Sequence, residues 1–234
     1  MRASGICCPL RAETVRLQTP AALRREEVYR YMGCPQDDPT ASRLLDVCEP
    51  ALLTAVQPRG VWRMLSRSEI PAGLRLDTGD AARHLEGCDR ILLMAVTLGP
   101  GVEPLLRRYT ATDVALASAA DAAGSVLAEQ VADGLERSLR DRFAGQGLYL
   151  TGRYSPGYGD WPIQVQSELC RVLDTGRSIG LGVSENSLMA PRKSITAVLG
   201  AADHPVTGKL AGCGNCVLRD TCGYRKRGKT CADR

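Results

Sequence analysis

Residues 112–143 read TDVALASAADAAGSVLAEQVADGLERSLRDRF, the longest stretch of this 234-residue chain with a single periodicity. Apolar residues recur there every three or four positions, as on one face of an α-helix. They are Leu116, Ala120, Ala123, Leu127, Val131, Leu135 and Leu139. Polar residues recur every four positions, and they are Asp121, Ser125, Glu129 and Asp133. We predict one long helix, whose acidic face is either solvated or, at Glu129, directed at a cationic ligand. Gly124 costs this helix about 1 kcal/mol relative to alanine, which indicates close approach of another element.

The strand that we expect at the centre of the fold is Ile91–Thr97 (ILLMAVT), a continuous apolar run typical of a buried strand. Further strands are predicted at 61–70, 148–152, 176–183 and 194–199. Shorter helices are predicted at 21–32, from a cap at Thr40 or Ser42 to Pro58, and at 80–86, 102–109 and 165–173. Because strands and helices do not alternate regularly, the fold class is α+β, a twisted antiparallel or mixed sheet flanked by helices.

The domain organisation follows from these elements. We expect an N-terminal arm and small helical lead-in at 1–58, with 1–20 as a loose arm. The sheet domain covers 59–200, a Gly/Ala/Pro linker 201–212, and a cysteine-rich, metal-binding tail 213–234.

Composition limits the class of protein. The net charge is only +4, so a general nucleic-acid surface is not expected. The sequence shows no secretory signal and no apolar run of membrane-spanning length, which favours a cytoplasmic protein without a membrane partner. Ten cysteines in such a protein indicate metal or redox chemistry more than disulfides.

The segment Arg153–Pro162 (RYSPGYGDWP) has the composition of a shaped loop. Its prolines fix φ, and Gly157 and Gly159 permit positive φ. Arg153 offers a planar set of donors that suits a carboxylate. Three of the chain's ten aromatic residues lie within it, so it is either a binding loop or a well-packed turn.

Four cysteines near the C-terminus are spaced C-x2-C-x5-C-x8-C, and they are Cys213, Cys216, Cys222 and Cys231. Four thiolates among glycines can converge on one centre. We expect a [4Fe–4S] cluster, with zinc as the alternative and free or redox-active thiols as a third reading.

Several of these motifs together resemble the reactivation domain of cobalamin-dependent methionine synthase, and more closely its free-standing bacterial versions. The motifs are Ile91–Pro100 (ILLMAVTLGP), Asp121–Ser125 (DAAGS), Leu127–Glu129 (LAE), Arg153–Tyr158 (RYSPGY), Ser184–Asn186 (SEN) and Pro191–Thr196 (PRKSIT). The resemblance covers roughly residues 60–200.

The resemblance implies a function. S-adenosylmethionine binds over the corrin of an inactive cob(II)alamin enzyme, and its methyl group plus one electron restore methylcobalamin. The binding residues it implies are Glu129, Arg153, Ser155, Pro156, Gly157 and Tyr158. The implied partner is a cobalamin-binding methionine synthase or a related corrinoid protein, with flavodoxin or ferredoxin as electron donor.

The chain also departs from the family pattern. The family has C-P-D-H after its tyrosine, whereas this chain has Gly159–Pro162 (GDWP), and a second family tyrosine has no match. The cysteine tail is absent from the fused domain, so we hypothesise that it is the protein's own electron-delivery centre. Two alternatives stay open: a non-catalytic, zinc-binding adaptor, and an activator of a different corrinoid methyltransferase.

Overall fold

The computed structural model describes residues 11–206, 208, 220, 221 and 226. The four cysteines of the tail, Cys213, Cys216, Cys222 and Cys231, lie outside these residues.

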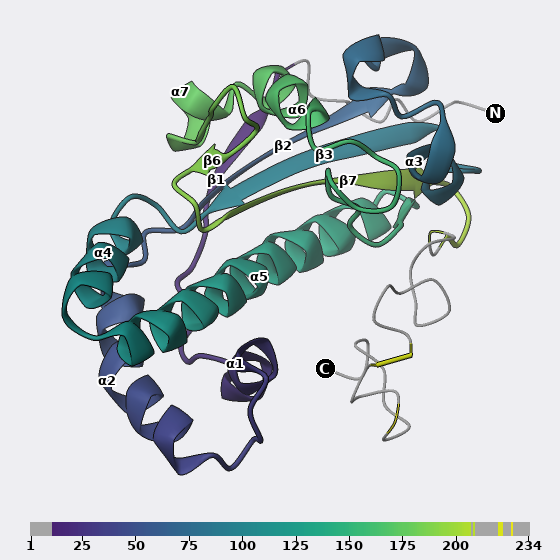
Figure 1. Ribbon diagram of the computed structural model, residues 1–234. Coiled ribbons are helices and arrows are strands. Elements are labelled where there is room, and N and C mark those ends of the chain that lie inside the picture. The colour runs from purple at the N-terminus through teal and green to yellow at the C-terminus, as the bar shows by residue number, and fades with distance from the viewer. Residues whose placement is uncertain (1–10, 207, 209–219, 222–225, 227–234) are drawn as a thin grey trace.

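A five-stranded antiparallel sheet forms the middle of the molecule, with strand order β1-β2-β3-β7-β4 (Figure 1). The strands are β1 (Glu13–Arg16), β2 (Arg59–Ser66), β3 (Arg90–Thr97), β7 (Ser194–Ala202) and β4 (Tyr149–Leu150). The predicted central strand is β3, which pairs with β2 on one side and β7 on the other. The α+β prediction is therefore confirmed, and the sheet is antiparallel rather than mixed.

One face of the sheet is covered by the predicted long helix, α5 (Val114–Ala144), which runs along the strands (Figure 1). It begins where the Asp113 side chain accepts a hydrogen bond from the Leu116 amide. Three helices pack against α5, namely α1 (Arg25–Met32), α2 (Pro39–Ala55) and α4 (Val102–Thr112). The helices and this face of the sheet share one hydrophobic core, which includes Trp62, Met94 and Leu127.

The opposite face carries shorter elements. They are two 3₁₀ turns (Arg67–Glu69 and Ala72–Leu74), α3 (Gly79–His84), α6 (Val165–Leu173), α7 (Thr175–Ile179) and a hairpin of β5 (Gly182–Val183) and β6 (Met189–Ala190). They enclose a second core with Val61, Leu93 and Trp161. Neighbouring residues of a strand point to opposite faces, so the unbroken apolar run of β3 supplies both cores.

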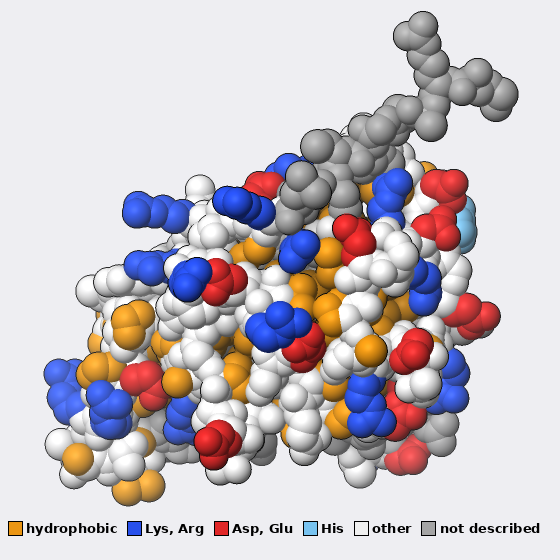
Figure 2. Space-filling model, turned by 90° about the horizontal axis from the view of Figure 1, so that it is seen from above, with side chains coloured by type: hydrophobic (Ala, Val, Ile, Leu, Met, Phe, Trp, Pro, Cys, Tyr) orange, Lys and Arg blue, Asp and Glu red, His pale blue; other side chains and the backbone are white. Residues whose placement is uncertain are grey.

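Figure 2 views the molecule from the side of α6 and α7. Among the side chains that it draws in colour, acidic and basic groups are interspersed over this face, with hydrophobic groups visible between them. No helix within the described ranges is both long enough and apolar enough to cross a bilayer.

Two element predictions are wrong. Residues 13–16, predicted to lie in a loose arm, form the edge strand β1. Only alternate residues of β1 are partly buried, so its apolar signal is weak. Residues 176–183, predicted as a strand, form α7 and then β5. The Thr175 hydroxyl donates to the carbonyl of Leu181 and closes this turn of helix, which the apolar spacing did not reveal.

Three boundaries also differ from the predictions. The predicted strand 61–70 ends at Ser66, which forms a capping box with Glu69 and starts a 3₁₀ turn. The second helix is capped by the Asp38 carboxylate, which accepts from the next two amides of the helix, rather than by Thr40 or Ser42. Strand β7 continues to Ala202, into the segment predicted as linker.

Candidate ligand-binding site

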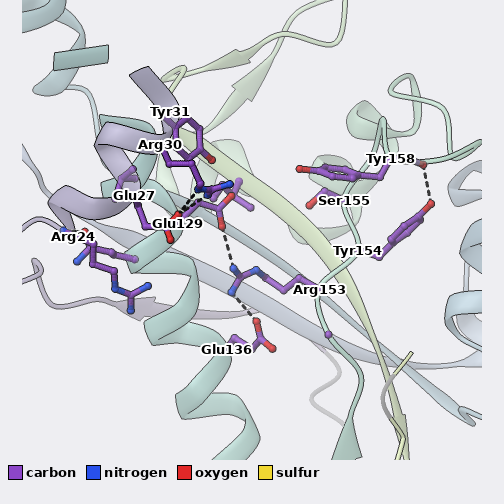
Figure 3. Close-up of a pocket in the computed structure, with 14 residues that line it drawn as sticks. Arg24, Glu27, Arg30, Tyr31, Glu129, Glu136, Arg153, Tyr154, Ser155 and Tyr158 are labelled. Atoms are coloured by element: carbon purple, nitrogen blue, oxygen red, sulfur yellow. Dashed lines mark hydrogen bonds and ion pairs between the residues drawn. The ribbon is translucent and has the colours of Figure 1, made fainter. Parts of the chain in front are cut away.

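A cavity of about 400 Å³ lies between helix α1, helix α5 and the Arg153 loop (residues 153–162) (Figure 3). Its volume falls in the range of small-molecule sites. Its wall is formed by Arg24, Glu27, Arg30, Tyr31, Val126, Glu129, Gln130, Glu136, Gly152, Arg153, Tyr154, Ser155, Tyr158 and Ile195. Most of these side chains are polar or charged, so the cavity suits a ligand that carries charges of its own.

Arg153 lines the cavity and pairs with three carboxylates of α5. Its Nη1 lies 2.7 Å from Glu136, and its Nη2 lies 2.8 Å from Asp133 and 3.1 Å from Glu129. These carboxylates lie on one side of α5 because residues three and four apart are neighbours on a helix surface. Two residues of the polar stripe predicted from the sequence, Glu129 and Asp133, therefore bind an arginine of the same chain.

Other arginines balance the remaining acidic charge. Arg24 pairs with Asp133 at 2.6 Å, and Arg140 pairs with Glu136 at 2.6 Å. Arg140 also donates to the carbonyls of Leu150 and Thr151, just before the Arg153 loop. The network thus joins α1, α5 and the loop.

The ion pairs shift the pKa values of Arg153 and Asp133. Burial alone would lower the pKa of Arg153, but Glu136, Asp133 and Glu129 outweigh it and raise that pKa. Burial would likewise raise the pKa of Asp133, but hydrogen bonds from Arg153 and Arg24 hold it below its usual value. Both shifts favour the ionised form, so Arg153 stays a cation and Asp133 an anion at neutral pH.

The structure brings together four of the six ligand residues predicted from sequence. Glu129, Arg153, Ser155 and Tyr158 line the cavity. Pro156 and Gly157 do not line it; they form the turn between Ser155 and Tyr158. Gly157 has φ +89° and donates its amide to the carbonyl of Trp161, so the turn needs a residue that tolerates positive φ.

The contribution of α1 was missed by sequence reasoning. Arg24 at its N-cap and Glu27, Arg30 and Tyr31 within it all line the cavity. Tyr31 is 50% exposed and Tyr158 is 63% exposed. The run REEVYRY carries charges that a solvated helix would also carry. Only the packing of α1 on α5 shows that some of these side chains line the cavity.

The residues that depart from the family pattern have a structural role. The amide of Asp80 donates to the Asp160 carboxylate at 2.7 Å, and the amide of Asp160 donates to the Asp80 carboxylate at 3.2 Å. Trp161 is buried, stacks on Tyr154 and donates its indole N–H to the carbonyl of Leu74. These contacts hold the far end of the Arg153 loop against the rest of the domain.

Among the described residues, no cluster of three or more His, Cys, Asp or Glu side chains could hold a metal ion. The cysteines within that part of the chain are thiols, and burial raises the pKa of Cys48 to about 11. That thiol is therefore protonated and unreactive near neutral pH. The metal site predicted at the tail cysteines falls outside the described residues.

Fold and cavity together are those of an α+β domain with a preformed polar site. Residues 81–215 match the family described as vitamin B12 dependent methionine synthase, activation domain. The match spans more than half of the chain, so this protein belongs to that family. A comparison with curated proteins finds no match.

Among solved structures, the chain resembles one described as the crystal structure of the MetH reactivation domain bound to AdoHcy. The TM-score is 0.61 and the sequence identity 18%, with 95% of this chain and 88% of that chain covered. At this identity the likeness shows a shared fold. The covered share is larger than the family match, which spans residues 81–215.

Proposed function

We propose that this protein binds S-adenosylmethionine in the cavity and uses it to reactivate a cobalamin-dependent methyltransferase, most directly methionine synthase. The observation that carries the proposal is the cavity itself, built around Arg153 in a domain of the activation family. The bound AdoHcy of the structural relative is the demethylated form of this ligand, which supports the choice of ligand class.

The charges of the cavity suit S-adenosylmethionine. Its methionyl carboxylate would meet Arg153. The guanidinium has five N–H donors and donates three hydrogen bonds to carboxylates of α5, which leaves donors for the ligand. Its ammonium and sulfonium cations would meet Glu129, the most exposed of the three carboxylates at 37%. Tyr31 and Tyr158 are partly exposed rings on the cavity wall and offer flat surfaces to the adenine.

The protein contributes to the reaction by positioning S-adenosylmethionine relative to the corrin of the partner. One electron and the methyl group of S-adenosylmethionine convert cob(II)alamin to methylcobalamin, and the S–CH₃ bond breaks as AdoHcy leaves. Holding the methyl group over the corrin of the partner replaces a bimolecular encounter by an oriented one. No side-chain nucleophile is required, because the cobalt of the partner's corrin accepts the methyl group.

The source of the electron is a separate part of the proposal. We assign it to a low-potential donor such as flavodoxin or ferredoxin, with a [4Fe–4S] cluster on Cys213, Cys216, Cys222 and Cys231 as an intermediate carrier. The support is the spacing of these cysteines and the low potentials that thiolate-ligated clusters reach. Anaerobic purification should yield iron and sulfide, whereas zinc alone would favour a structural role for the tail.

A second function rests on the same cysteines. Zinc in the tail and a domain that serves only for docking would make the protein a non-catalytic adaptor. In a further alternative, the protein is an activator whose partner is a corrinoid methyltransferase other than methionine synthase.

The test of the proposed function is a reactivation assay. Methionine synthase in the cob(II)alamin state is mixed with the protein, S-adenosylmethionine and a chemical reductant, so that the result does not depend on the tail. Formation of methylcobalamin is followed by absorbance. We expect Arg153→Ala to slow it by about tenfold or more, as expected for loss of a charge-assisted contact to the ligand.

The matched control is Arg171→Ala, which removes an exposed arginine that pairs with Glu168 on α6, away from the cavity. It should leave the rate unchanged. Equal rates with and without the protein would contradict the proposed function with this partner.

A further inference from the structure

Helix α3 contacts the segment around the Arg153 loop at both ends. At one end, Asp80 and Asp160 exchange two hydrogen bonds between backbone amides and carboxylates. At the other end, His84 Nε2 lies 2.9 Å from the carbonyl oxygen of Gly152 and 3.2 Å from the Thr151 hydroxyl. The six-residue helix α3 therefore contacts the chain just before the Arg153 loop and again near the end of that loop.

The His84 ring continues into a stack of aromatic rings. It is 1% exposed and lies 5.0 Å from the Tyr154 ring at an interplanar angle of 22°. Tyr154 lies 5.8 Å from Trp161 at 18°. The Tyr154 hydroxyl donates to the carbonyl of Tyr158 at 2.8 Å. Because Tyr154 and Tyr158 line the cavity, His84 supports that wall from behind.

The hydrogen bonds of His84 define its tautomer. A bond to the Gly152 carbonyl requires the proton on Nε2, because a carbonyl only accepts. Nδ1 is then an acceptor, and it is buried without a partner among the described residues. Burial lowers the pKa of His84, in keeping with a neutral ring.

The other edge of the ring is covered by the chain that follows β7. Gly208 lies so close that a Cβ there would come within 2.5 Å of His84 Cε1 and 2.8 Å of Nδ1. The ring is therefore in contact with Gly208 on one edge and with the loop that lines the cavity on the other.

We propose that His84 is a positioning residue for the ligand site: its Nε2–H and its ring hold residues 152–158 in the conformation that shapes the Tyr154–Tyr158 wall. The proposal rests on the proposed function only for the identity of the ligand. Its structural part concerns the loop and can be measured without any ligand.

The test compares three variants by hydrogen–deuterium exchange of the amides of residues 153–161 and by titration with AdoHcy. His84→Phe keeps a flat ring but removes the donor, and we expect loop exchange to rise about tenfold, the change that corresponds to loss of one net hydrogen bond. AdoHcy affinity should fall by about fivefold or more. His84→Gln offers an amide N–H and should stay within about twofold of wild type.

The control is Cys48→Ala, which opens the buried helical core on α2 without touching the loop. If His84→Phe raises loop exchange no more than Cys48→Ala does, the proposal is overturned. Equal losses in the Phe and Gln variants would overturn the role of the donor.

Two further outcomes are also decisive. If His84→Phe does not fold, Gly208→Ala takes its place. The added methyl group would press on the His84 ring from outside the loop. Unchanged loop exchange in that variant would overturn the proposal. If the wild-type protein binds no AdoHcy, the proposed function fails, while the exchange data still decide the role of His84.

Discussion

Arg153 forms ion pairs with helix α5, and in the proposed function it would also bind the ligand carboxylate. Three carboxylates hold it in place, and its side chain is 15% exposed on the cavity wall. An arginine fixed in this way loses little side-chain entropy when a ligand carboxylate arrives. In the proposed function, the carboxylates of Glu129, Asp133 and Glu136 would therefore orient the cation that meets the ligand carboxylate.

The Asp133 carboxylate provides a pH test of this network. Its pKa is lowered in the folded state, so its ionised form stabilises the protein above its unfolded pKa of about 3.9. That contribution is lost as the pH falls through the lower, folded pKa. We expect Asp133→Asn to cost about 2 kcal/mol of unfolding free energy at neutral pH and much less near pH ~2. Urea unfolding at both pH values measures this, with exposed Asp46→Asn as the control; a loss independent of pH would contradict the ion-pair role.

Sequence could predict this site only where local composition constrained it. The Arg153 loop is recognisable from its prolines, glycines and rings, and Glu129 from its place on the polar stripe of α5. The side chains of α1 could not be predicted, since a contact between residues such as Arg24 and Asp133 is set by packing more than a hundred positions apart in sequence.

Helix α5 was predicted correctly from the sequence, but the element that approaches Gly124 is known only from the structure. Gly124 indicated a close approach, and the neighbour is the buried side chain of Lys193, whose Cε lies 3.2 Å from a Cβ placed at Gly124. Lys193 is itself held by Asp121 at 2.8 Å and by Ser125 at 3.0 Å. The identity of that neighbour depends on the pairing of β7 with β3, which no local pattern encodes.

A pair of glycines on α5 tests this reading. Gly134 has no atom within 4 Å of a Cβ, so Gly134→Ala should stabilise the protein by about 1 kcal/mol through helix propensity. Gly124→Ala should show no gain, because the added methyl group would press on the Lys193 side chain, which Asp121 and Ser125 hold in place. Thermal or urea unfolding measures the stability of both variants. An equal gain in stability at the two positions would show that the Lys193 side chain moves away from the added methyl group at no cost.

At the scale of the whole molecule, the lead-in and the sheet domain share their interior. Leu45 and Leu52 of α2 lie in the same core as Trp62 of β2 and Leu127 of α5. The sequence separates them because Pro58 ends the helical pattern, yet the hydrophobic core continues from α2 to β2. The boundary near residue 58 stays a prediction about sequence organisation, and cooperativity of folding is the property that tests it.

A fragment of residues 59–206 tests that boundary. Without α1 and α2, the side of α5 that they cover would be exposed, and α1 would no longer supply its wall of the cavity. We expect the fragment to be aggregated or only partly folded in circular dichroism and gel filtration, while residues 11–206 fold cooperatively. A fragment 59–206 with a sharp unfolding transition would show that the lead-in is a separate unit.

The central claim is that the cavity between α1, α5 and the Arg153 loop binds S-adenosylmethionine. Isothermal titration of the purified protein with this ligand tests it most directly, using wild type, Arg153→Ala and the control Arg171→Ala. We expect saturable binding at one site in wild type and control, and affinity at least about tenfold weaker, equivalent to ~1.4 kcal/mol, in Arg153→Ala. Absence of binding in a folded wild-type protein, or binding that Arg153→Ala leaves unchanged, would contradict it.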